Sequence, residues 1–390
     1  MSIDADRASG ANRKNVRDLS GMWKIGIDTP TLCPVLYPST DCFGPVDLMF
    51  MNKIAGSTAS EPDRSVSLAR GSAKSSSPVD QDITAQLERR LGRTYAKQRV
   101  GIENDHETRV FGGGLNFFHV ENWYAAPWLI WGVLRLTGLY RRAQQNAERI
   151  QVRKNIVRSN KIPRPFDGFS ILHISDMHVD MNEGAMRRLT DILPDLNYDI
   201  CVLTGDYRGK THGPFEATLD GMAQVRSHLS GPVYGVLGNH DTIRMVPGLE
   251  TMGIRMLLNE NEPIVRHGEQ IYLAGIDDAH FYRVDNIEKA ASEIPDDAFS
   301  ILLSHTPEIY RQGAHAGFDL LLSGHTHGGQ ICLPGSIPIT LDSVLPRHMG
   351  SGAWEYHDMA GYTSAGVGSC IVAVRLNCPP EITLHRLERG

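Results

Sequence analysis

The stretch LLSGHTHGGQ (residues 321–330) places two histidines, His325 and His327, two residues apart after an apolar run. Imidazole nitrogens are common ligands of divalent metals, and the flanking glycines permit tight turns. Taken alone, the stretch is compatible with a polar turn after a buried strand. A metal site is the sharper interpretation, and it requires ligands from elsewhere in the chain.

Four other apolar runs end in residues of the same chemical kind. The runs SILHIS, CVLTG, VYGVLG and SILLS are followed in turn by Asp176 and His178, by Asp206, by Asn239, His240 and Asp241, and by His305. Open α/β sheets present ligands beyond the carboxyl ends of their strands. Five such endings therefore predict one shared site at a sheet edge, and they argue against a purely structural explanation.

The predicted ligand set contains carboxylate, amide and imidazole groups, without a thiolate. This mixture favours Mn²⁺, Fe or Zn²⁺ and disfavours a cysteine-type structural zinc site, although it does not fix which metal is bound. The ligands are too many for one tetrahedral ion. Two divalent ions that share a bridging carboxylate would use all of them.

The motifs DMH, GD, GNHD, SH and GHTH, in this order over about residues 168–386, resemble the calcineurin-like metallophosphoesterase superfamily. The segments GHTHGGQICLPG, GNHDTIR and CPPEITL are similar to its bacterial membrane-associated branch, which includes phosphodiesterases and hydrolases of UDP-diacylglucosamine. The resemblance implies a four-layer α/β/β/α sandwich. The alternation of strands and helices by itself predicts only an α/β domain.

The resemblance also implies a role for each ligand. It assigns Asp176, His178 and His327 to one ion, Asn239, His305 and His325 to the other, and Asp206 to both. His240 is then the catalytic residue beside the phosphate, where it donates a proton or stabilises charge. A hydroxide that bridges the two ions is expected to attack phosphorus directly, without a covalent enzyme intermediate.

Three further residues are candidates for substrate contact, and each has an alternative. Arg208 offers donors suited to phosphate oxygens, but it is equally compatible with a solvated loop. His212 is more typical of a loop histidine, and Asp241 is equally compatible with a helix cap. The run GDYRG lacks the second acid of the GDxxD pattern that orients the GNH histidine in some superfamily members. His240 must therefore be oriented by another group.

The organisation of the chain follows from composition and periodicity. Residues 1–85 have linker-like composition and are expected to have low order, and translation starting at or beyond Met49 is an open alternative. Residues 86–165 are expected to be helical, with a polar helix over 82–108, and residues 166–390 to form the catalytic domain. Helices are predicted over 184–194, 215–229 and 285–293, and two strands between Tyr362 and Arg389.

The segment 115–150 has the features of a membrane-interface helix. WYAAPWLIWGVL (123–134) is twelve apolar or small residues with three of the five tryptophans, which is too short to span a bilayer. Nine basic residues and one acid follow between Arg135 and Arg164. Tryptophan and arginine beside a short apolar helix suit an interface with anionic lipid. The alternative is a helix that braces the catalytic domain.

Composition narrows the remaining choices. The net charge is −6, so no nucleic acid partner is expected, and the six cysteines form no CxxC pair, which favours a reducing compartment. We recognise no signal peptide, and expect a cytoplasmic protein with peripheral contact at the inner face of the membrane as an open alternative. The predicted function is hydrolysis of a phosphodiester or pyrophosphate bond in a lipid-linked substrate. A soluble phosphodiesterase and a non-catalytic binding scaffold are the alternatives.

Overall fold

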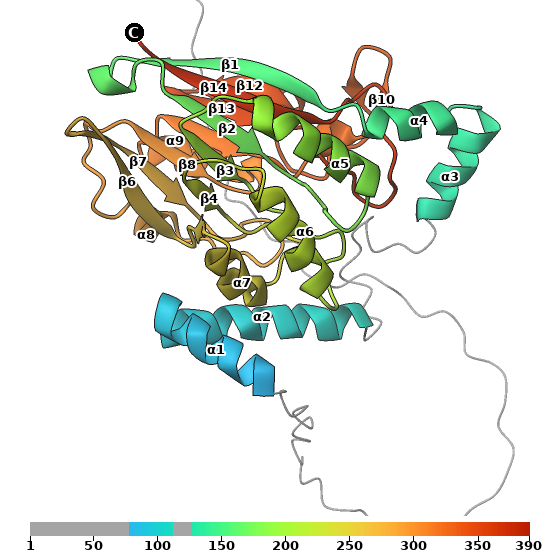
Figure 1. The fold of residues 1–390 in the computed structure, drawn as a ribbon, viewed down its shortest axis with the longest axis horizontal. Coiled ribbons are helices and arrows are strands. Elements are labelled where there is room, and N and C mark those ends of the chain that lie inside the picture. The colour runs from blue at the N-terminus through green and yellow to red at the C-terminus, as the bar shows by residue number, and fades with distance from the viewer. Residues whose placement is uncertain (1–77, 112–125) are drawn as a thin grey trace, which may run out of the picture. The chain divides into compact units, whose positions relative to one another are not determined.

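The computed structural model describes residues 78–111 and 126–390, which form two six-stranded sheets (Figure 1). The first sheet contains, in order, β1 (Gln151–Ser159), β14 (Glu381–Arg389), β2 (Ser170–Ile174), β3 (Ile200–Leu203), β4 (Val233–Gly235) and β5 (Ile254–Met256). The second contains β12 (Gly352–Tyr356), β13 (Met359–Thr363), β9 (Leu320–Ser323), β8 (Ser300–Leu303), β7 (Glu269–Gly275) and β6 (Glu260–Arg266). A short hairpin joins β10 (Cys332–Leu333) and β11 (Ile337–Pro338).

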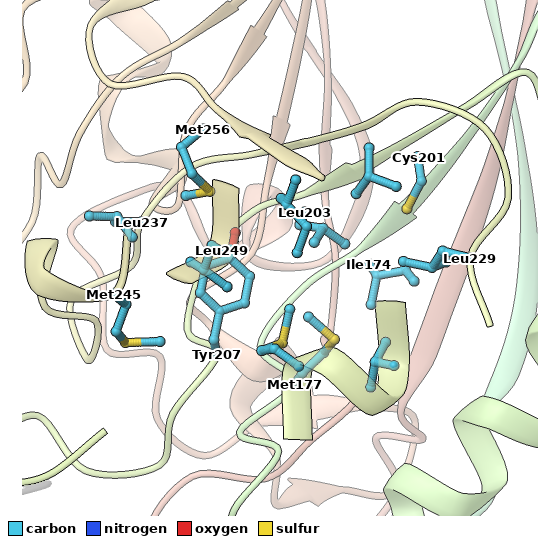
Figure 2. Packing of buried hydrophobic residues seen from close by; sticks show 14 of the residues in the cluster. Ile174, Met177, Cys201, Leu203, Tyr207, Leu229, Leu237, Met245, Leu249 and Met256 are labelled. Atoms are coloured by element: carbon cyan, nitrogen blue, oxygen red, sulfur yellow. The ribbon is translucent and has the colours of Figure 1, made fainter. Parts of the chain in front are cut away.

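Three hydrophobic cores define four layers. One core lies between the sheets, where Ile171 and Val202 face Ile301 and Leu320. A second packs the first sheet against α5 (Glu183–Ile192), α6 (Glu216–Arg226) and α7 (Val246–Thr251), and Figure 2 shows part of it. The third packs the second sheet against α8 (Ile287–Ala291) and α9 (Tyr310–His315). This arrangement agrees with the predicted α/β/β/α sandwich.

The central strands are the apolar runs identified in the sequence. Strands β2, β3, β4, β8 and β9 are buried almost throughout, and within each sheet they run parallel to one another where they are neighbours. Burial on both faces explains why they lack the polar alternation of a surface strand. The three predicted helices correspond to α5, α6 and α8, with small differences at their ends.

The edge strand β1 was not predicted, because its sequence QVRKNIVRS is mostly polar. It pairs in parallel with β14, and most of its residues are exposed. The sheet therefore begins before residue 166. Arg153, Arg158 and Lys161, which the sequence analysis grouped with the membrane segment, instead pair with Glu381, Glu388 and Asp319.

The polar helix expected over 82–108 is two helices, α1 (Pro78–Leu91) and α2 (Arg93–Phe111). Gly92, between them, has φ of +88°, a conformation that glycine adopts at little cost and that ends α1. Leu87, Leu91 and Ala96 are buried in the core that contains α7. Residues 1–77, most of the predicted low-order region, lie outside the described residues.

The segment 115–150 is described from residue 126 onward. It forms α3 (Ala126–Leu136) and α4 (Tyr140–Ala147). One side of this pair, with Leu134 and Ala143, packs on Val372, Val374 and Leu376. Within the part of the chain that the structure describes, no helix has both the length and the apolar character to cross a membrane.

Candidate metal centre

The predicted ligands follow their strands and meet at one edge of the sandwich. The loops after β3 and β4 touch so closely that a Cβ on Gly238 would overlap the Asp206 carboxylate. A Cβ on Gly324, after β9, would likewise overlap the side chains of Ser175 and Asp176. The glycines of the GNHD and GHTH motifs are therefore required by close approach of the loops that hold the site.

Five of the seven predicted ligands have a left-handed backbone, which is uncommon for residues other than glycine. The φ angles are +52° for Asp176, +41° for His178, +54° for Asp206, +70° for His325 and +49° for His327. Such conformations cluster at functional sites, where the surrounding structure holds them in place. The concentration here indicates that the loops are shaped for the positions of these side chains.

The first group of ligand atoms surrounds Asp176 and His178. One atom from each of Asp176, His178 and Asp206 lies within 4.8 Å of the others. His327 joins this group, because its Nε2 is 3.1 Å from His178 Nε2 and 3.5 Å from Asp176 Oδ1. Cys370, which the sequence analysis did not single out, lies within 4.8 Å of His178 and His327.

The second group shares Asp206 with the first. One atom from each of Asp206, His305 and His325 lies within 4.8 Å of the others. Asn239 belongs to the same group, because its Oδ1 is 2.9 Å from His305 Nε2. The structure therefore brings together all seven residues proposed as ligands, and Asp206 is the carboxylate common to both groups.

The imidazoles are oriented by groups outside these two clusters. Nδ1 of His178 donates to the Arg208 carbonyl at 2.7 Å, and Nδ1 of His305 donates to the Thr204 carbonyl at 2.8 Å. Nε2 of His325 donates to the Asp342 carbonyl at 2.7 Å. Each bond places a proton on the outer nitrogen and leaves the opposite nitrogen turned toward the ligand groups, as in metal-binding histidines. This donor set fits divalent ions.

His327 is held differently. A guanidinium nitrogen of the fully buried Arg375, Nη2, is 3.1 Å from its Nδ1, and its Nε2 is the atom next to His178 and Asp176. The same guanidinium donates to the carbonyls of Gly366 and Gly368. Arg375 was not recognised in the sequence, since arginine followed by LNCPP carries no metal-site signal. It is a fully buried cation in direct contact with a predicted ligand.

The charges at the centre favour ionised Asp206. Burial opposes its ionisation, but His305 and His240 outweigh burial and hold the pKa of Asp206 well below its usual range. Burial also lowers the pKa of His305, but Asp206 reverses the effect and raises it to about 10. Burial lowers the pKa values of His178 and His327. A buried carboxylate that stays ionised next to several imidazoles is suited to a dication.

His240 lies beside both groups without belonging to either. Its Nε2 is 4.0 Å from Asp206 Oδ2 and 3.9 Å from the sulfur of Cys370. Thr211 Oγ1 lies 3.2 Å from its Nδ1. Thr211 thus occupies the orienting position for which the run GDYRG offers no acid.

The three candidate substrate contacts have different surroundings. Arg208 is buried and donates to the carbonyls of His240, Thr211 and Gly213, so its guanidinium braces this loop. Asp241 is not a cap of the following turn, because Thr242 fills that position. Its carboxylate instead accepts from the backbone N–H groups of Asp206, Tyr207 and Gly238. His212 is partly buried on the loop after Arg208, within electrostatic reach of α2.

A chain of buried hydrogen bonds runs behind Asp176. His385 Nε2 is 3.3 Å from His173 Nδ1, and His173 Nε2 is 2.8 Å from Thr204 Oγ1. Thr204 donates to Ser175 Oγ at 2.7 Å, and Ser175 bonds the Asp176 carboxylate. His173 is fully buried in β2, and its contribution to this chain could not be inferred from the sequence of an apolar strand.

His280 contributes a second imidazole next to the predicted ligand His325. Its ring centroid is 4.3 Å from that of His325, and its Nδ1 is 2.9 Å from Glu308 Oε2. Burial lowers the pKa of His280, but the bond to Glu308 raises it by more. His280 is therefore more readily protonated than a free imidazole, and it lies next to the second group. The run DDAHFYR that contains it has no spacing typical of a metal site.

Comparison with known proteins gives a consistent identification. Residues 169–329 match the family model described as calcineurin-like phosphoesterase. The metallophosphoesterase YkoQ of Bacillus subtilis is 30% identical over 56% of this chain and 83% of its own length. A zebrafish (Danio rerio) transmembrane protein with a metallophosphoesterase domain is 29% identical over 57% of this chain and 54% of its own length. The phosphodiesterase YaeI of Escherichia coli is 26% identical over 56% of this chain and 82% of its own length.

Proposed function

The chain belongs to the calcineurin-like phosphoesterase family, and from this premise we propose that it cleaves a phosphodiester or pyrophosphate bond with two bound divalent ions. As a family member it is a metal-dependent phosphoester hydrolase. The observation that carries the finer proposal is that Asp206 is shared by two groups of ligand atoms. A single ion would leave one group unused.

In the proposal, each group holds one ion. Asp176, His178 and His327 hold the first, Asn239, His305 and His325 hold the second, and Asp206 lies between them. The chemistry of these ligands suits Mn, Fe or Zn, and two such ions would neutralise phosphate oxygens and lower the pKa of water toward about 7. No serine or cysteine nucleophile is needed.

His240 supplies the acid in this proposal. Its Nε2 faces Asp206, and Thr211 Oγ1 is at hydrogen-bond distance from its Nδ1. A protonated imidazole here can donate to the leaving oxygen of a phosphate bound at the edge. Asp241 and Arg208 are proposed to hold the loops rather than touch substrate, because their polar atoms bond the backbone. His212 remains the candidate for an outer substrate contact.

The proposed substrate is lipid-linked, and α3 supplies the support. Trp128 is 75% exposed and Leu136 90% exposed, and Leu129 and Val133 are also exposed. Arg135 and the exposed Arg141, Arg142 and Arg149 follow this apolar face. An apolar face bordered by arginines suits the surface of an anionic bilayer, on the cytoplasmic side if the protein resides there. The name of the zebrafish relative agrees with a membrane setting.

A soluble phosphodiesterase is the second candidate. The inner side of α3 and α4 packs on Val372, Val374 and Leu376, so the pair also braces a loop that carries Arg375. In this alternative, the outer apolar face has no lipid partner, and nucleotides or small diesters are the substrates. The two candidates share the same chemistry and differ only in how the substrate is presented.

The test is hydrolysis by the purified protein with added Mn²⁺. We expect turnover of bis-p-nitrophenyl phosphate that exceeds turnover of p-nitrophenyl phosphate and that disappears with EDTA. A nucleotide-linked diacyl lipid should be cleaved faster in anionic vesicles than in detergent if the lipid proposal is right. Equal rates in both presentations favour the soluble alternative, and absence of metal-dependent turnover contradicts the proposed function.

A further inference from the structure

Helix α2 contacts the catalytic domain through buried charged residues as well as apolar ones. One face of α2 is turned toward the domain. It carries residues at helical spacing, namely Tyr95, Arg99, Glu103 and His106. Arg99 is fully buried and Glu103 is 5% exposed. Buried ion pairs are weak contributors to stability, since desolvation offsets much of their attraction. Their presence calls for an explanation beyond holding a helix in place.

Glu103 binds the loop that follows His240. Its carboxylate accepts from Thr242 Oγ1 at 2.6 Å and from the Ile243 N–H at 2.7 Å. Arg244 Nη1 is 3.2 Å from the same carboxylate. Thr242 comes two residues after His240, so this one side chain fixes the start of the turn that emerges from the GNHD motif.

Arg99 binds a second loop at the same edge. Its Nε is 3.0 Å from Asp277 Oδ2, and its guanidinium lies over the Tyr282 ring at 3.9 Å from the centroid. The Tyr95 hydroxyl donates to the same carboxylate. Residues 277–282 contain His280, the imidazole in contact with His325. Arg99 therefore fixes the loop that brings His280 to the second group of ligands.

The two contacts are connected within α2. Arg99 Nη1 is 2.5 Å from Glu103 Oε1, one helical turn away. The pair thus links the loop of His240 to the loop of His280 through adjacent turns of one helix. The ring of His106, one turn further on, lies 4.6 Å from that of Phe281 and continues the contact.

We propose that Arg99 and Glu103 are positioning residues for hydrolysis, which set the places of His240 and His280 beside the metal centre. This inference rests on the proposed function and extends it. Residues that precede the segment matched by the family model thereby become part of the catalytic unit. A displacement of about 1 Å in such loops can lower the rate about 100-fold. The gain in rate from exact placement therefore explains why a buried charged network is present.

The chain contains a matched control for this proposal. Arg90 of α1 also forms a bidentate pair across elements, with Glu260 at 2.6 and 2.7 Å, and it contacts Glu250. Its partners lie on β5, β6 and α7, and they are not part of the loops that contain His240 and His280. Loss of this pair tests the effect of loosening the N-terminal helices alone.

The experiment compares Arg99→Met and Glu103→Gln with Arg90→Met. For each, the melting temperature, the bound Mn²⁺ and the kcat and KM for bis-p-nitrophenyl phosphate are measured well below the melting temperature. We expect Arg99→Met and Glu103→Gln to lower kcat about 10- to 100-fold with KM and metal content nearly unchanged. Arg90→Met should lower the melting temperature but leave kcat within about twofold. Arg99→Lys should restore part of the lost kcat.

The proposal is overturned if all three variants have equal kcat at a comparable loss of melting temperature. It is also overturned if bound Mn²⁺ falls in proportion to kcat. If the buried variants do not fold, Thr242→Val removes one bond to Glu103, and it should still lower kcat several-fold. Hydrogen exchange separates this inference from the proposed function, because it needs no turnover. Faster exchange in Glu103→Gln confined to 239–244 and 277–282 supports positioning, and unchanged exchange there contradicts it.

Discussion

The metal centre and the outer face of α3 reverse the usual distribution of side chains in opposite ways. At the centre, Asp176 and His178 are fully buried, although charged and polar groups normally face water. On α3, Trp128 and Leu136 are exposed, although large apolar groups normally face the core. Both departures cost free energy in an isolated chain, and both therefore point to function.

The two regions differ in how much geometry they require. The imidazoles of the centre are fixed by backbone carbonyls, and the loops carry left-handed residues and close glycine contacts. The outer face of α3 consists of exposed apolar side chains that are not fixed by comparable hydrogen bonds. Binding of such a face to lipid depends on its apolar area rather than on exact geometry. Changes at the centre should therefore affect every substrate, whereas changes on α3 should affect only substrates presented in a membrane.

The largest effect is expected for Asp206→Asn. The variant removes the negative charge shared by both groups, so turnover of soluble and lipid substrates should fall to background. Metal analysis after gel filtration should show that bound Mn²⁺ is reduced as well. If only one of two ions is lost and turnover persists, Asp206 does not link the two groups as proposed.

His240→Ala should lower the rate of both substrate classes by about 100-fold or more, since a positioned acid contributes about 10²- to 10⁴-fold. The bound Mn²⁺ should remain close to that of the unmodified protein, because His240 is not assigned as a ligand. Parallel metal analysis and kinetics check this. Metal loss as complete as in Asp206→Asn would show that His240 is a ligand instead.

On α3, the double variant Trp128→Ser and Leu136→Ser should weaken binding to anionic vesicles about tenfold or more, since each large apolar side chain contributes on the order of 1–2 kcal/mol when buried. Hydrolysis of bis-p-nitrophenyl phosphate should not change. Val265→Ser on β6 is the matched control, because Val265 is also exposed. Salt should weaken vesicle binding of the parent protein without abolishing it.

Co-sedimentation of the parent protein with anionic vesicles at low salt shows whether the protein binds lipid at all. If the parent protein stays in the supernatant, α3 is a structural brace, and the comparison between the two regions fails on that side. Trp131 is not used in the test, because its ring packs against Tyr140 and under the Arg135 guanidinium. A change there would disturb folding and lipid contact together.

The sequence predicted the residues of the centre better than the groups that orient them. Strand ends mark Asp206 and His325, because apolar runs followed by polar residues are local patterns. The carbonyls that orient the imidazoles, and the support from Arg375 and Thr211, depend on contacts between distant segments. The same reason hid Arg99, since α2 has the composition of an ordinary surface helix. β1 was missed because an exposed edge strand lacks the apolar run that marks the central ones.

The smallest effect concerns buried imidazoles that lie behind the centre and belong to neither region. Burial lowers the pKa of His173 from 6.5 to about 3, and burial and His173 lower that of His385 well below its usual value. The unfolded chain therefore binds protons at these residues below about pH 6.5, whereas the folded protein does not. Stability from this source is complete above pH 6.5 and is lost as pH falls toward the folded pKa values.

Between pH 6.5 and 5.5, each of the two histidines should cost about 1 kcal/mol in the free energy of unfolding. Urea unfolding in EDTA removes the contribution of metal loss. His385→Gln should reduce the difference between the two pH values by about 1 kcal/mol, whereas the exposed His228→Gln should not change it. An unchanged difference in His385→Gln would mean that His385 is protonated in the folded protein. The hydrogen-bonded chain would then not end in neutral imidazoles, and its support of Asp176 would need another donor.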